Sequence, residues 1–208
     1  MNAQHRSTMV VEEHKAASVA GNHRLLISGG KVALFAGLLW GAAAAGEIPI
    51  PGTPVPITLQ TFVVMLAALT LSWREAGSAV VLYLAAGAVG LPVFAGGASA
   101  AALIGPSAGF LLGFLPGVIV TALLKGKPAK TASDAKTALR SRVLTAMRYF
   151  AASMVGCVGV VYAVGFAVQS ALTGMPLIAV ATASVGFIAG DLVKAAIAAL
   201  ACAGLIRK

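Results

Sequence analysis

Charged residues are scarce in this sequence. They make up 10% of its 208 residues, whereas hydrophobic residues make up 59%. A soluble domain carries about 25% charged residues, and a soluble chain of this length has too little interior for so many apolar side chains. The shortage of charge excludes an ordinary soluble domain and predicts an integral membrane protein. The net charge of +9 is then expected in loops on one side of a membrane, not on a nucleic-acid surface.

Motifs for nucleotide, metal and redox chemistry are also missing. The chain has no G-x-x-x-x-G-K-[ST] phosphate loop, so it is not expected to hydrolyse ATP in that way. Cys157 and Cys202 lie in apolar segments and read as small buried hydrophobes. His5, His14 and His23 recur at a spacing that matches no metal-ligand geometry. We therefore expect no metal and no cofactor, and we expect no cleavable signal peptide because no apolar run follows the first basic residues.

The apolar residues form runs near the roughly 20 residues that a membrane-spanning helix needs. They predict an all-α, polytopic bundle of six transmembrane helices over residues 25–208, preceded by a polar, mobile cytoplasmic tail at residues 1–24. A basic connector at residues 125–142 interrupts the bundle, and residues 98–109 are expected to fold back over it. The six segments are 25 or 31 to 45, 57–72, 76–90, 110–124 (kinked near Pro116), 144–169 and 181–206.

Two short stretches break the helical pattern. Residues 47–56 contain four prolines, which exclude a helix because each removes an amide donor and restricts the preceding residue. This stretch predicts a stiff loop. Trp73, Arg74 and Glu75 predict a tight turn at the membrane interface.

The Lys and Arg residues decide the orientation. Fourteen of the fifteen fall in the N-terminal tail and the helix entry that follows it, the 73–75 turn, the 125–148 region or the C-terminus, and the loops at 46–57, 91–109 and 170–180 hold none. By the positive-inside rule both termini are cytoplasmic.

The exception is Lys194, which shares the last apolar segment with Asp191. Residues three apart on a helix lie on one face, and charges at bilayer depth normally face a bundle interior or a wet cavity. Asp191 lies about ten residues, or about 15 Å, from the outer end of its segment. Two interpretations stay open: a structural ion pair, or a polar ligand site in a pocket that opens to the outside. Thr58, Gln60 and Thr61 could likewise cap a helix or face a ligand.

Small residues recur every fourth position in the first segment, at Ala33, Gly37, Gly41 and Ala45. Such a row lets another helix approach closely. It predicts either packing inside the bundle or a docking face for a partner protein.

Four ordered motifs closely resemble the BioY family, the biotin-specific substrate-binding (S) components of energy-coupling factor (ECF) transporters. The resemblance spans residues 30–206. The motifs are Pro54–Thr61, Leu82–Gly97, Gly105–Phe114 and Gly190–Ala195.

The resemblance implies high-affinity biotin uptake, with biotin as substrate rather than cofactor. Asp191 would accept hydrogen bonds from the ureido N–H groups of biotin, and Lys194 would donate a hydrogen bond to its tail carboxylate or its ureido carbonyl. Thr58, Gln60 and Tyr83 would add hydrogen bonds, while Phe94, Gly96 and Gly97 would form a lid. The implied partners are a transmembrane coupling protein, which would dock on the Ala33–Ala45 row, and two cytoplasmic ATP-binding subunits.

Two other function classes remain. One is a stand-alone biotin transporter or facilitator, for which uptake would survive loss of the ATPase partners. The other is an intramembrane enzyme that uses Asp191 as acid or base, which is disfavoured because no second catalytic group is visible near it. We expect no enzyme activity.

The charge asymmetry gives a test of topology. In a cysteine-free background, single cysteines at Thr53 and Thr173 are expected to react with an impermeant reagent in intact cells, while one at Ser133 is protected. Labelling of the Ser133 variant in intact cells would overturn the orientation.

Overall fold

Helices are the main secondary structure in the part that the structure describes, residues 3–127 and 135–205 of a computed structural model. Among these residues the only β contact is an isolated bridge between Ile48 and Ile57. The predicted all-α class is confirmed. The helices are α1 (Ala3–Ala44), α2 (Gln60–Thr70), α3 (Trp73–Ala88), η1 (Ala95–Gly97), η2 (Ala100–Leu103), α4 (Ala108–Leu124), α5 (Ala135–Ser153), η3 (Met154–Val160), α6 (Val161–Thr173), α7 (Leu177–Ala183) and α8 (Val185–Leu205).

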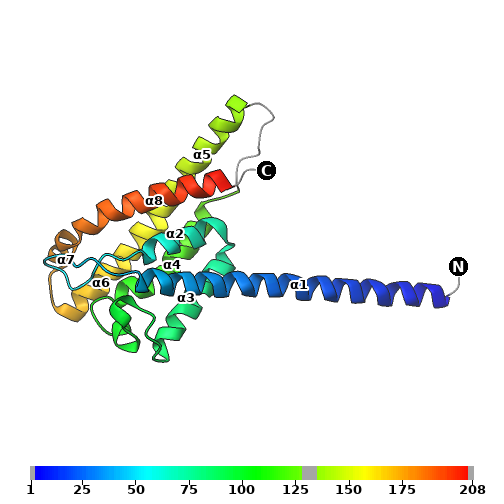
Figure 1. Ribbon diagram of the computed structural model, residues 1–208, viewed down its shortest axis with the longest axis horizontal. Helices are drawn as coiled ribbons and strands as arrows, with labels where there is room; N and C mark the ends of the chain where they lie inside the picture. The colour runs from blue at the N-terminus through cyan, green and yellow to red at the C-terminus, as the bar shows by residue number, and fades with distance from the viewer. Residues whose placement is uncertain (1–2, 128–134, 206–208) are drawn as a thin grey trace.

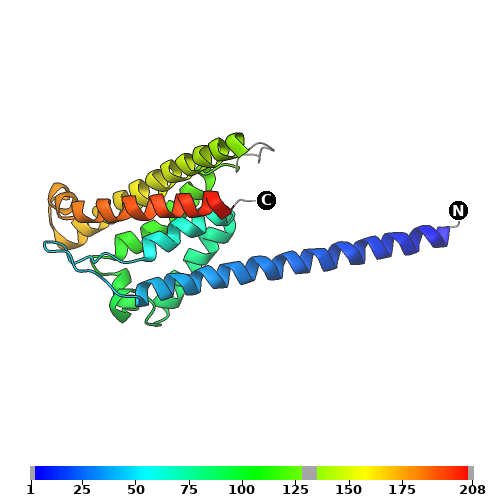
Figure 2. The same cartoon turned by 45° about the horizontal axis from the view of Figure 1, so that its top comes forward.

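Three helical stretches are long and apolar enough to cross a membrane: His23–Ala44, Lys136–Thr173 and Val185–Gly204. Helices α2 and α4 are shorter apolar helices. The N-terminal end of α1, the start of α5 and the C-terminal end of α8 all point to the same side of the molecule (Figures 1 and 2). This arrangement agrees with termini on one side, while the number of spans remains a prediction.

Helix α1 begins far earlier than the first hydrophobic segment. The polar residues expected as an irregular tail continue the helix back to Ala3, and α1 projects well beyond the bundle (Figure 1). The stretch holds no proline, and its first glycine is Gly21, so nothing in it breaks a helix. The side chains before His23, including His5 and His14, lie outside the described part of the chain.

Other boundaries also differ from the prediction. Trp73, Arg74 and Glu75 form the first turn of α3 rather than a turn between helices. Ser72 caps this helix, because its hydroxyl accepts from the Glu75 amide while the Glu75 carboxylate accepts from the Ser72 amide. The basic connector is shorter than expected, since α5 starts at Ala135; its residues 128–134 lie outside the described part.

The last apolar segments also break differently. The fifth segment holds a π-helical stretch, η3, between α5 and α6. The sixth segment begins inside the short helix α7, which ends at Ala183, and Ser184 separates α7 from α8.

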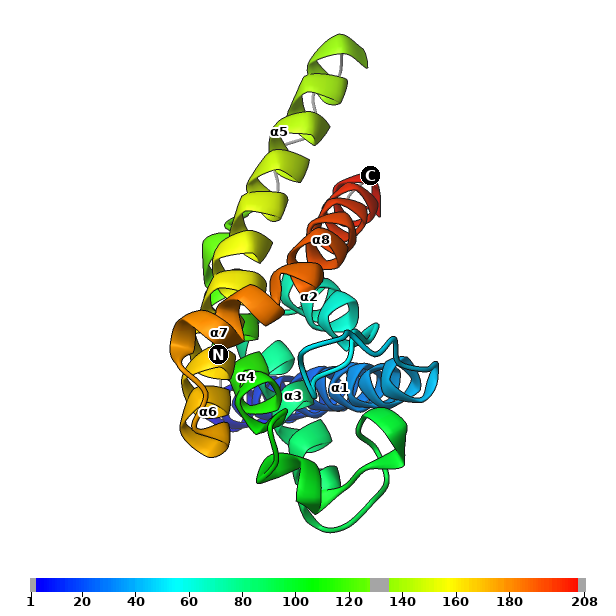
Figure 3. The ribbon, with the colours of Figure 1, turned by 90° about the vertical axis from the view of Figure 1, so that its left-hand side faces the viewer.

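The proline-rich loop is closed by its own backbone. Ile48 and Ile57 exchange two hydrogen bonds, with N···O distances of 2.9 and 2.8 Å, and this pairing draws the ends of the loop together. Residues 91–107 form irregular backbone with the two short 3-10 turns instead of a span, as expected (Figure 3). Both loops lie at the end of the bundle that holds the cavity described below.

Helix α4 packs very closely against η3 and α6 through Gly109, Gly113 and Gly117. A Cβ atom at these three positions would lie 2.9, 3.1 and 2.9 Å from backbone oxygens of the partner segment. The row has four-residue spacing and matches the small-residue packing of membrane helices. It fixes the central wall of the bundle.

The small-residue row that the sequence predicts lies on α1, not on α4. Ala33, Gly37, Gly41 and Ala45 are all exposed, and nothing lies within 4 Å of a Cβ built on Gly37 or Gly41. This row therefore does not pack inside the bundle.

The glycine contact between α4 and η3 predicts a sharp effect on stability. A Cβ on Gly156 would lie 2.1 Å from Thr121 Oγ1 and 2.6 Å from the Gly117 carbonyl oxygen. Gly156→Ala is expected to destabilise the protein by about 1–3 kcal/mol, seen as a lower thermal midpoint in detergent. Gly204→Ala is the matched control, because nothing lies within 4 Å of its Cβ position. Equal midpoints for the two variants would contradict the packing argument.

Candidate ligand-binding cavity

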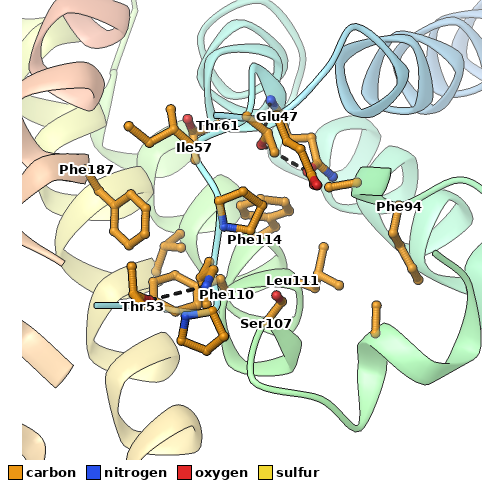
Figure 4. Close-up of a pocket in the computed structure, with 18 of the residues that line it drawn as sticks. Glu47, Thr53, Ile57, Thr61, Phe94, Ser107, Phe110, Leu111, Phe114 and Phe187 are labelled. Carbon is orange, nitrogen blue, oxygen red and sulfur yellow. Dashed lines mark hydrogen bonds between the residues drawn. The ribbon is translucent and has the colours of Figure 1, made fainter. Parts of the chain in front are cut away.

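A cavity of about 310 Å³ lies at the loop end of the bundle. Helices α2, α4, α6 and α8 form its walls, and the proline-rich loop and the loop after α3 cover it (Figure 4). Its volume falls in the range of small-molecule sites, about 300–1,000 Å³. The polar lining residues are Glu47, Thr53, Thr58, Gln60, Thr61, Ser107, Tyr162, Asp191 and Lys194.

Asp191 and Lys194 form an ion pair in the wall of this cavity. The Nζ–Oδ1 distance is 3.0 Å, and the two side chains are 5% and 13% exposed. Both predicted features are therefore present together: the residues pair with each other, and both line a cavity. Burying two charges is costly unless further hydrogen bonds complete them.

The groups that complete the hydrogen bonds of the pair come from α6, from the first turn of α2 and from Thr58 just before α2. Lys194 Nζ also donates to the Thr58 carbonyl oxygen at 2.7 Å and to Thr61 Oγ1 at 2.9 Å. Thr61 Oγ1 in turn donates to Asp191 Oδ1 at 2.8 Å, and Tyr162 donates its hydroxyl to Oδ2 at 2.6 Å. All three ammonium donors are engaged, whereas the carboxylate accepts three bonds and can accept about four.

Gln60 links the cavity to α3 and to the loop after α3 through a chain of hydrogen bonds. Its side chain is buried, accepts from Thr58 Oγ1 at 3.0 Å and donates to the Tyr83 hydroxyl. Tyr83 then donates to the Val93 carbonyl oxygen at 3.1 Å. Tyr83 does not line the cavity; it holds Gln60 and the loop after α3 in place.

That loop contributes Phe94, Ala95 and Ala98 to the lining, but neither Gly96 nor Gly97. Both glycines have positive φ, 66° and 74°, which other residues rarely adopt. They shape the turn that brings Phe94 in. The Phe94 ring packs edge-on against Tyr83, at 5.2 Å between centroids.

Phenylalanines from three segments contribute to the apolar wall: Phe94, Phe110, Phe114 and Phe187. Phe110 makes edge contacts with Tyr162, Phe166 and Phe187, at 6.2, 5.9 and 6.1 Å between centroids. Phe187 and Phe94 lie on opposite sides of the cavity (Figure 4). Gly165 leaves room for Phe110, because a Cβ there would lie 2.6 Å from the ring.

The sequence analysis missed Phe110, Phe114, Phe187 and Tyr162, and it also missed Glu47, Thr53 and Ser107. Phe110 and Phe114 fall in one of the quoted motifs, but nothing marked them as lining residues. Tyr162 sits in an apolar helix without a polar neighbour in sequence. The one feature of the sequence that could have pointed to Tyr162 is the rarity of tyrosine, since the chain holds three.

The cavity therefore suits a small molecule with both apolar and polar parts. It offers aromatic side chains, the carboxylates of Glu47 and Asp191, the ammonium group of Lys194 and several hydroxyl groups. Among the described residues, no group of three His, Cys, Asp or Glu side chains could hold a metal ion.

Comparison with known proteins identifies the family. Residues 18–208 match the BioY family. The chain is 34% identical to the biotin transporter BioY of Rhizobium etli over 81% of this chain and 87% of that protein. It is 37% identical to the biotin transporter BioY of Thermotoga maritima over 74% and 82% of the two chains.

A solved structure has the same fold. It is the crystal structure of the S-component for biotin from an ECF-type ABC transporter, with a TM-score of 0.77 and 25% identity over 90% of this chain and 94% of that one. From the match over nearly the whole chain and the shared fold, we conclude that this protein belongs to the BioY family.

Proposed function

We propose that this protein takes up biotin across the bacterial cytoplasmic membrane as the substrate-binding S component of an ECF-type transporter. The observation that carries the proposal is the aromatic-walled cavity with the Asp191–Lys194 pair in its wall. The names of the relatives and of the solved structure support the same substrate. These relatives are transporters, in agreement with the expectation that the chain is not an enzyme.

Biotin and the cavity are chemically complementary. Its ureido ring carries two N–H donors, and Asp191 has acceptor capacity left for one of them. Lys194 already donates all three of its N–H groups to protein atoms. For Lys194 to donate to biotin, an oxygen of biotin must replace one of these acceptors: the Thr58 carbonyl, the Thr61 hydroxyl or the Asp191 carboxylate. The apolar rings of biotin would lie against Phe110, Phe187 and the other aromatic walls.

Of the other predicted residues, some line the cavity and others hold the lining residues in place. Thr58 and Gln60 face the cavity and can exchange hydrogen bonds with ligand. Phe94 closes one side, and Gly96 and Gly97 set the loop that presents it. Tyr83 acts from behind, through Gln60. We propose no cofactor.

The exposed row Ala33, Gly37, Gly41 and Ala45 is the proposed docking face for a coupling protein. Close approach of two membrane helices depends on small side chains, and Gly37 and Gly41 have open space beside them. The coupling protein would link this chain to two cytoplasmic ATP-binding subunits.

Substitutions in the pair test the binding site. Asp191→Asn and Lys194→Ala are each expected to weaken biotin binding about ten- to a hundredfold, the effect of losing a hydrogen bond to a charged group, about 1.5–3 kcal/mol. Titration calorimetry on detergent-purified protein measures this.

A double variant separates binding from stability. Each single variant leaves one buried charge alone, so its thermal midpoint should fall, whereas Asp191→Asn with Lys194→Met removes both charges and should recover much of it. Biotin affinity should stay low in the double variant. Wild-type affinity in the well-folded double variant would mean that the pair is structural only.

Leucine in the exposed row tests docking. Ala33→Leu and Gly37→Leu should leave biotin binding and the thermal midpoint unchanged, because both sites are exposed. Biotin uptake in cells and copurification of the coupling protein should be lost. Ala151→Leu, at an exposed position on α5, is the control that should keep all three.

Two results would reject the docking face. Row variants that transport at the wild-type rate would show that no partner docks there. Uptake that persists in cells without the ATP-binding subunits would favour a stand-alone transporter instead.

A further inference from the structure

A seam between α1 and α3 carries two hollows, separate from the substrate cavity. The first, of about 550 Å³, lies near the start of α3, and the second, of about 340 Å³, lies further along the same two helices. On α1, Ser28 and Val32 line the first hollow, and Ala36 and Trp40 line the second. These residues recur every fourth position, so both hollows lie on one face of α1.

The first hollow is positively charged. Arg24, Lys31 and Arg74 line it, against the single carboxylate of Glu75. That carboxylate is already engaged: it accepts from Ser28 and Ser72 and pairs with Lys31 at 3.4 Å. Burial raises the pKa of Glu75, but these hydrogen bonds and the Lys31 charge outweigh it and bring the pKa to about 2. The carboxylate thus stays ionised and is paired with Lys31, so it does not neutralise Arg24 or Arg74.

Neither arginine is neutralised within the described residues. Arg24 makes no ion pair there, and Arg74 lies over the ring of Trp73, 5.1 Å from its centroid. Trp73 is half exposed, as expected of an aromatic residue at the membrane interface. The hollow therefore has an excess of positive charge at the level where lipid headgroups lie.

The second hollow is almost wholly apolar. Gly37, Trp40, Leu82 and Leu91 line it. Lys31 and Trp40 are nine residues apart on α1, a rise of about 14 Å, and half of the hydrocarbon core of a bilayer is about 15 Å. The seam therefore matches the length of an acyl chain that begins at the cationic hollow.

We propose that this seam binds one anionic phospholipid, with its phosphate at Arg24, Lys31 and Arg74 and an acyl chain along the α1–α3 face. Arginine suits the phosphate because its planar fork can donate two hydrogen bonds to it. The apolar continuation and the exposed Leu25 beside the cations favour a lipid over a soluble anion.

Native mass spectrometry of the detergent-purified full chain tests the proposal. The probes are palmitoyl-oleoyl phosphatidylglycerol and the zwitterionic phosphatidylcholine with the same chains. Wild type is expected to bind the anionic lipid more tightly. Arg24→Gln with Arg74→Gln should weaken that binding by about fivefold for each cation removed. Thermal midpoints verify that the variant is folded.

Two matched variants sharpen the test. Lys136→Gln with Arg140→Gln removes the same charge from exposed positions on α5 and should keep wild-type lipid binding. Arg24→Lys with Arg74→Lys keeps the charge and should recover part of the affinity lost in the glutamine variant.

Three outcomes would overturn the proposal. One is equal affinity of wild type for the two lipids. Another is an equal loss in the α5 control, which would show a general charge effect. The third is displacement of the anionic lipid by millimolar inorganic phosphate, which would indicate a site for a free anion.

Discussion

The Asp191–Lys194 pair is the interaction on which the substrate end of the bundle depends. Two charges at bilayer depth are stable only when other groups complete their hydrogen bonds. Here Thr58 lies just before α2, Thr61 lies in the first turn of α2, and Tyr162 comes from α6. The pair therefore ties α8 to two other helices, and the same groups that stabilise it form one wall of the cavity. Under the proposed function, these residues would serve both stability and ligand recognition.

The contact of α4 with η3 and α6 depends instead on the absence of side chains. Gly109, Gly113 and Gly117 bring α4 against η3 and α6 at near-contact distance. Gly165 then leaves space for Phe110, which packs against Tyr162 and Phe187. The aromatic lining is thus set by glycines that never touch a ligand, since their missing side chains decide where the rings can lie.

The outer face of α1 is left for other interactions. Its small residues Ala33, Gly37, Gly41 and Ala45 are exposed, and one helix position away the seam with α3 holds the two hollows. Gly37 belongs to both surfaces. A coupling protein and a lipid chain would therefore lie on neighbouring faces of one helix, away from the cavity proposed to bind biotin.

The sequence by itself determined the membrane class, the order of the apolar segments, the two irregular loops and the placement of Asp191 and Lys194 in a cavity of the bundle. Each of these follows from local composition or spacing, and the four motifs also indicated the family. Helix limits at Trp73 and Ala135 were less accurate, because a capping box and a continuing helix were read as a turn and a connector.

Only the tertiary structure decided which neighbour each residue meets. It placed Tyr83 behind Gln60, brought Tyr162 to Asp191, and gathered phenylalanines from α4 and α8 into one wall. The two small-residue rows make the point most clearly. Both have four-residue spacing on an apolar helix, yet Gly109–Gly117 packs inside the bundle and Ala33–Ala45 faces outward. Spacing along a helix fixes which residues share a face; what that face contacts depends on helices distant in sequence.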